Sequence, residues 1–157
     1  MRHTLLDDTC YVFDNDAVST RGSYIHFRRE ISDHLDLNPR NVAIIGSAKF
    51  GWSMSPEKFG AAYNHQESDI DIAIVSRPLF ESCWDQIRRA FYNGYDHIRK
   101  DHRNEIFAKF LILHPKINYD SMYLRDIRKQ MLDLNRIVYE HLKIEDKAKY
   151  RIYEDWS

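Results

Sequence analysis

The spacing of apolar positions along the chain predicts an alternation of helices and short buried strands. Apolar residues recur at intervals of three and four, as on one face of a helix, in the segments 19–36, 76–100 and 120–142. Two shorter runs, 42–45 and 69–75, are almost continuously apolar, which is typical of buried strands. This order predicts an α/β or α+β fold, with a mixed central sheet flanked by helices.

Capping residues and prolines indicate where the first two helices begin and end. Ser19 or Thr20 can cap the first helix, and Asn38-Pro39 stops it, because the residue before a proline is pushed out of the helical region. Ser76 is the expected cap of the second helix, and Pro78 suits its first turn. We therefore expect each helix to be followed or preceded closely by a strand.

The remaining segments are less regular. Residues 106–113 are apolar apart from Lys109, so their pattern fits a strand or a helix equally. The last helix has Asp120 or Ser121 as its cap. Residues 143–157 are charged and aromatic, and no element is predicted there.

Composition narrows the class of protein only slightly. A chain of 157 residues suits a single domain, 1–157, with a real core, and it could also be the front part of a longer protein. The net charge of −1 gives no overall attraction to nucleic acid or anionic lipid. Cys10 and Cys83 lack metal-ligand spacing and are expected to be reduced thiols. No segment has the length of a membrane span, so we expect a cytoplasmic protein without a membrane partner.

Two acids separated by one isoleucine begin the strand at 69–75. Side chains two apart in a strand face the same way, so Asp69 and Asp71 present neighbouring carboxylates while Ile70 and Ile72 face away. Neighbouring carboxylates repel each other unless a cation neutralises them, and hard oxygen ligands suit Mg²⁺ or Mn²⁺. The pair predicts a metal site of the kind that assists in-line phosphoryl displacement.

A second motif, Gly46-Ser47, directly follows the strand at 42–45. Glycine has no Cβ, so the backbone can turn sharply and approach a triphosphate. Ser47 adds a hydroxyl and a main-chain amide, and an amide at the start of a helix favours an anion. Lys49 and Lys58 lie in the following loop, where they could contact phosphates or be solvated. We take Gly46, Ser47 and Lys49 as candidate nucleotide ligands.

These residues together resemble a known family. The stretches 42–47 (VAIIGS) and 68–75 (SDIDIAIV) resemble the signature of the DNA polymerase β-like nucleotidyltransferases, and 46–56 is similar to small bacterial members with a long spacer. The resemblance implies the nucleotidyltransferase fold, with Ser47 on nucleotide phosphate and Asp69 and Asp71 as catalytic metal ligands. The implied reaction transfers a nucleoside monophosphate from ATP or another triphosphate to a hydroxyl on a protein, an RNA or a small molecule.

The chain departs from the family pattern at two points. The spacer at 48–68 is longer than usual, and a third carboxylate, which active members bring from a later strand, is not evident. Asp120 is the first candidate for this third catalytic acid and Glu105 the second, although Asp120 also suits a helix cap. The alternative function is a catalytically inactive module that binds nucleotide or a partner protein. Bacterial relatives often belong to toxin–antitoxin or phage-defence systems.

Other classes of site fit the sequence less well. Haloacid-dehalogenase phosphatases have a threonine where this chain has Ala73, and glycosyltransferases with an acid pair need a larger chain. His97 and His102 are five residues apart and do not share a helical face, so we expect them at the surface.

Overall fold

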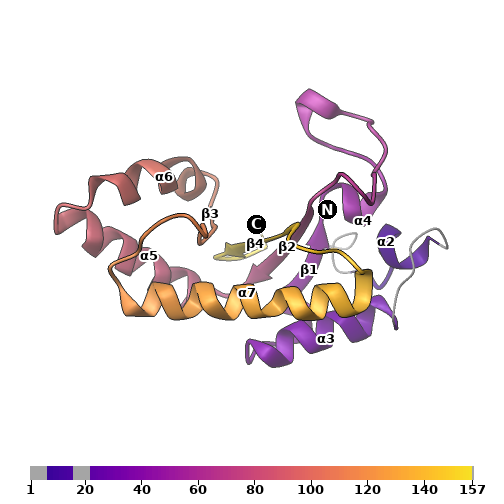
Figure 1. Cartoon of the computed structure of the whole chain (residues 1–157), viewed down its shortest axis with the longest axis horizontal. Coiled ribbons are helices and arrows are strands. Elements are labelled where there is room, and N and C mark those ends of the chain that lie inside the picture. Colours follow the sequence, from indigo (N-terminus) through magenta and orange to yellow (C-terminus); the bar gives the residue numbers. More distant parts are fainter. Residues whose placement is uncertain (1–6, 16–21, 157) are drawn as a thin grey trace. The chain divides into compact units, whose positions relative to one another are not determined.

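The computed structural model describes residues 7–15 and 22–156 (Figure 1). The chain packs as two compact units, each with a core of its own and each built from two stretches of sequence. The first unit consists of Met1–Ala73 and Leu134–Lys149, and the second unit consists of Ile74–Asp133 and Tyr150–Ser157.

The strands form one four-stranded sheet in the order β1-β2-β4-β3. Strands β3 and β4 are antiparallel, with Phe110 opposite Tyr153. Strands β2 and β4 run parallel, because the amide of Ile70 donates to the carbonyl of Lys147 and that of Ser76 to the carbonyl of Tyr153. The mixed sheet with helices confirms the predicted fold class at this level. The strand bounds are β1 Val42–Ile45, β2 Ile70–Val75, β3 Phe110–Leu111 and β4 Ala148–Tyr153.

The first unit contains the short helix α2 (Tyr11–Asp14), the helix α3 (Tyr24–His34) and strand β1. The hydroxyl of Ser23 caps α3 by accepting from the amide of His26 at 3.3 Å, whereas Ser19 and Thr20, the predicted caps, lie outside the described residues. Helix α3 ends before Asn38-Pro39, as predicted, and a 3-10 turn, Pro39–Asn41, leads into β1. The core of this unit includes Phe27, Ile31, Val42, Ile44, Ile70, Ile72, Leu134 and Val138.

The long spacer between β1 and β2 has local structure of its own. It begins with the four-residue helix α4 (Ser47–Phe50) and contains a 3-10 turn, Pro56–Lys58. Trp52 forms an isolated bridge with Ala62, and its ring packs edge-on against Phe59 with centroids 5.7 Å apart. The spacer at 48–68, predicted to be a long loop, therefore contains secondary structure and packing of its own.

The second unit corrects the predicted helix at 76–100. Ser76 caps α5 (Arg77–Tyr92) as expected, but the helix ends at Tyr92 and a separate helix, α6 (Asp96–Phe107), follows. Gly94 lies between them with a φ of 92°, a backbone conformation that glycine adopts without strain. The ambiguous segment 106–113 contains the end of α6 and strand β3. The core of this unit includes Ile74, Phe80, Cys83, Ile87, Ile98, Leu111 and Leu124.

Helix α7 (Met122–Leu142) and strand β4 close the chain. The hydroxyl of Ser121 accepts from the amide of Leu124 at 3.4 Å, so Ser121 acts as the cap of α7. The strand β4 was not predicted, because Lys149 and Arg151 interrupt its apolar positions. Helix α7 is the longest described helix, and neither it nor another helix in the described part is apolar over enough residues to span a membrane.

Candidate functional site

The two aspartates lie where the start of β2 alternates between buried and exposed side chains. Ile70 and Ile72 are fully buried, whereas Asp71 is partly buried and Asp69 has 45% of its side chain exposed. This alternation follows from the pleat of a strand, in which successive side chains face opposite sides. The carboxylates of Asp69 and Asp71 therefore belong to the face of β2 that the core leaves accessible.

Gly46 brings the end of β1 next to the acidic strand. A Cβ atom at Gly46 would lie 3.6 Å from Oδ2 of Asp71, so any side chain at this position would contact that carboxylate. Gly46 has a φ of 69° and a ψ of −152°, a combination that other residues adopt only with strain. The local chain direction at the end of β1 thus requires glycine, and it places the Gly-Ser motif beside Asp71.

Ser47 is the first residue of α4 and is partly buried. The carbonyl of Gly46 accepts from the amides of Lys49 and Phe50 at 3.1 and 3.3 Å, which turns the chain into this single helical turn. Ser47 therefore directly follows Gly46, the residue that lies beside Asp71.

Lys49 has contacts that do not support a role in phosphate binding. Its side chain is buried, and its ammonium donates to the carbonyl of Asp7 at 3.0 Å and to the carbonyl of Thr9. The ammonium also lies 4.9 Å from the centre of the Tyr24 ring. Burial lowers the pKa of Lys49. These contacts attach the segment around Asp7 and Thr9 to α4.

Strand β4 brings a lysine to Asp69. Nζ of Lys149 lies 2.5 Å from Oδ2 of Asp69, and both side chains are about half exposed, at 52% and 45%. The β4 positions that alternate with buried Tyr150 and Ile152 carry Lys149 and Arg151, so the described strand offers cations beside β2. The alternation of charged and apolar residues in this segment was the sequence signal that could have revealed the strand.

The two candidates for a third acid both belong to the second unit. Glu105 already has several partners, because its carboxylate accepts from Nδ1 of His102 at 2.8 Å, from the amide of Ile112 at 2.9 Å and from Nε2 of His114 at 2.5 Å. Asp120 is exposed in the bend before α7. The assignment of either as a third catalytic acid stays a prediction.

His102 corrects a further prediction, because its side chain is fully buried. One ring nitrogen faces Glu105 and the other, Nε2, lies 2.9 Å from the hydroxyl of Tyr119. A histidine can be buried at little cost when both nitrogens have partners, which spacing along a helix does not reveal. The side chain of His97 lies outside the described residues.

Comparisons with known proteins give no relative that could place the chain in a family. No family model, no curated protein and no solved structure matches it. The nucleotidyltransferase assignment therefore depends on the two motifs and on their placement around Gly46 and Asp71.

Proposed function

We propose that the first unit binds a nucleoside triphosphate with Mg²⁺ and transfers its nucleoside monophosphate to a hydroxyl acceptor. The position of Gly46 beside Asp71, where a Cβ would lie 3.6 Å from the carboxylate, carries this proposal. Phosphates held by main-chain amides at Gly46-Ser47 would lie beside the carboxylates of Asp69 and Asp71, which are suitable ligands for Mg²⁺. The same small region would then hold both metal and phosphate, which nucleotidyl transfer needs.

Each residue has a defined task in this proposal. Asp69 and Asp71 would hold Mg²⁺, which would supply positive charge to offset the charge that develops on the phosphate oxygens. Gly46 allows the phosphate chain to approach the backbone, and Ser47 orients it through its amide and hydroxyl. The acceptor oxygen attacks the α-phosphorus, the bond to the β-phosphate oxygen breaks, and pyrophosphate leaves. The acceptor proton passes to a base, which water or a third carboxylate supplies.

Lys149 favours a second candidate function, nucleotide binding without turnover. Its ammonium, 2.5 Å from Asp69, partly neutralises the acid pair and competes with a metal for the same carboxylate. An ammonium also cannot accept the proton of an acceptor hydroxyl. In the second candidate, the unit binds a nucleotide or a partner protein and performs no transfer.

A double variant tests the proposed activity. Asp69→Asn with Asp71→Asn is expected to abolish transfer of labelled nucleotide and Mg²⁺-dependent triphosphate binding, measured by a labelling assay and by calorimetry. The matched control is Asp126→Asn with Asp133→Asn, which neutralises two exposed aspartates of α7. Undiminished transfer by the first double variant would refute the assignment.

Variants at Lys149 separate the two candidate functions. If the wild type is an enzyme, Lys149→Met keeps or raises turnover, because one competitor for Asp69 is removed. If the unit only binds, wild type and Lys149→Met both bind triphosphate without turnover, and Lys149→Asp, which adds a carboxylate beside Asp69, is the variant expected to gain transfer. Absence of triphosphate binding in all three proteins would contradict both candidates.

A further inference from the structure

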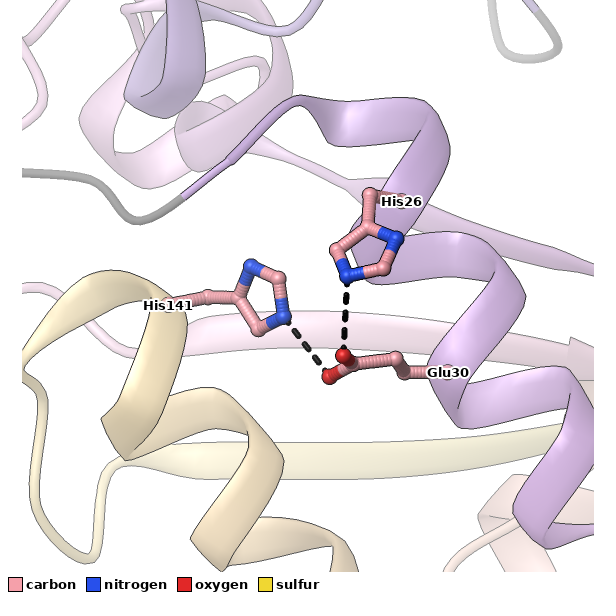
Figure 2. Close-up of side chains that lie close together, drawn as sticks. All are labelled: His26, Glu30 and His141. Atoms are coloured by element: carbon pink, nitrogen blue, oxygen red, sulfur yellow. Dashed lines mark hydrogen bonds and ion pairs between the residues drawn. The ribbon is translucent and has the colours of Figure 1, made fainter.

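Three side chains of metal-ligand type converge in the first unit and share no residue with the Gly46–Asp71 region. Figure 2 shows His26 and Glu30 on α3 and His141 on α7, with both rings directed at the Glu30 carboxylate. Nε2 of His26 lies 2.9 Å from Oε1 of Glu30, and Nε2 of His141 lies 2.8 Å from Oε2. One ligand atom from each of the three residues lies within 4.8 Å of the other two.

The helices explain this convergence. His26 and Glu30 are four residues apart, so they occupy neighbouring positions on one face of α3. His141 is the penultimate residue of α7, in the last turn, where the helix dipole favours a positive charge. It reaches Glu30 across 111 residues of sequence. The cluster therefore exists only in the folded first unit.

One side of the cluster is fixed and the other is open. The side chain of His141 is 3% exposed, and its ring packs against those of Phe27 and Phe13, with centroids 5.5 and 6.3 Å away. The side chains of His26 and Glu30 are 55% and 36% exposed. A small ion can thus approach from solvent toward a ring that the core already positions.

The second ring nitrogen of His141 determines which of the two nitrogens carries the proton. Nδ1 is buried and has no hydrogen-bond partner within the described part of the chain. The neutral ring therefore carries its proton on Nε2, where it donates to Glu30, and an ion at Nε2 would move that proton to Nδ1.

A similar cluster in the second unit lacks these properties. His102 uses both ring nitrogens, one with Glu105 and one with Tyr119. Glu105 accepts from His114 and from the amide of Ile112 as well. A metal there would have to replace an already complete set of buried hydrogen bonds, which is costly.

We propose that His26, Glu30 and His141 bind one divalent transition-metal ion, with Zn²⁺ as the best match. Two imidazoles and a carboxylate are suitable ligands for zinc, and an open side leaves the fourth position to water. Bond lengths of about 2.0–2.1 Å in a tetrahedron separate ligand atoms by about 3.3 Å. The two nitrogen–oxygen separations, 2.9 and 2.8 Å, would widen by about 0.5 Å, which rotations of the exposed His26 and Glu30 side chains can supply.

Zinc titration of the chelator-treated full chain tests this site. Calorimetry is expected to give one Zn²⁺ per wild-type chain, and the visible absorption of Co²⁺ is expected to indicate tetrahedral coordination. His26→Ala, which removes an exposed ligand and leaves the core intact, is expected to weaken binding at least about tenfold. His34→Ala is the matched control, because it removes another exposed histidine of α3. Equal weakening by both variants, or none by His26→Ala, would overturn the proposal.

Thermal unfolding provides an independent readout. An ion that binds only the folded chain is expected to raise Tm by roughly 5–10 °C at about a hundredfold excess over Kd. The rise is expected to fall to about half or less in His26→Ala and Glu30→Gln at the same zinc concentration and to persist in His114→Ala. It is also expected to persist in Asp69→Asn with Asp71→Asn, so failure of the nucleotide proposal and failure of the zinc proposal are distinguishable.

Discussion

Two clusters of two histidines and one glutamate occur among the described residues, and their surroundings differ. His102, Glu105 and His114 form a largely buried network in which Tyr119 and a main-chain amide complete the hydrogen bonds. The cluster around Glu30 is open on one side and leaves one buried nitrogen without a partner in the described region. Residue types alone therefore do not define a ligand site. A complete network stabilises a fold, and an incomplete one can accept a ligand.

Removing the central acid of the buried cluster is expected to have the largest effect on stability. Glu105→Ala leaves His102, His114 and the amide of Ile112 without their acceptor, which we expect to lower the free energy of unfolding by about 3–5 kcal/mol. Urea unfolding of metal-free protein measures this change. Glu30→Ala is the control from the open cluster, and an equal loss in both variants would remove the distinction between the clusters.

Tyr119→Phe is expected to have the next largest effect. The Tyr119 hydroxyl contacts Nε2 of His102 at 2.9 Å and accepts from the amide of His114 at 3.2 Å, so its removal leaves two polar groups short of a partner. We expect a loss of about 1–2 kcal/mol in the free energy of unfolding. Tyr139→Phe changes a tyrosine that is 43% exposed and serves as the control. If Tyr119→Phe loses less unfolding free energy than the control, the buried network tolerates the absence of the Tyr119 hydroxyl.

Glu30→Gln is expected to change the stability of metal-free protein by less than about 1 kcal/mol, because water screens its partly exposed ion pairs. Saturating Zn²⁺ is expected to enlarge the difference between wild type and variant, since only the wild type keeps all three ligands. Urea unfolding with chelator and with Zn²⁺ measures both values. If zinc leaves the difference in unfolding free energy between wild type and Glu30→Gln unchanged, the cluster around Glu30 is structural, as the buried cluster is.

Acid is expected to produce the smallest effect. Burial raises the pKa of Glu105, but hydrogen bonds from His102, Ile112 and His114 outweigh it, and the folded-state pKa lies below the ordinary 4.5. The carboxylate therefore contributes stability that is full above the unfolded-state pKa and is lost as the pH falls through the folded-state pKa. The difference in unfolding free energy between wild type and Glu105→Gln should shrink from about pH 5 to pH 3. A constant difference would show that the charge of Glu105 contributes nothing.

Local sequence patterns predicted some elements well. Strands β1 and β2 and the cap at Ser76 were predicted because each depends on neighbouring residues. The break between α5 and α6 was missed, since one glycine does not disturb an apolar repeat. Strand β4 was missed because the alternation of Lys149 and Arg151 with buried Tyr150 and Ile152 was interpreted as part of an irregular charged segment.

Local sequence patterns also predicted only part of the candidate sites. The two motifs predicted that Gly46 and Asp71 belong to one site, and in the structure a Cβ at Gly46 would lie 3.6 Å from the Asp71 carboxylate. The pairing of Lys149 with Asp69 and that of His141 with Glu30 join residues 80 and 111 positions apart, so no local pattern contains them. Long-range packing decides which side chains complete a site, and a single sequence does not report it.

The order β1-β2-β4-β3 has a consequence for the biosynthesis of this protein. Residues 148–153 leave the ribosome after the other described strands, yet they lie between β2 and β3 in the sheet. A nascent chain without these residues presents one hydrogen-bonding edge of β2 to its surroundings, and an open edge of apolar residues can pair with another chain. The interval before β4 emerges is therefore the period in which a chaperone would protect this protein most.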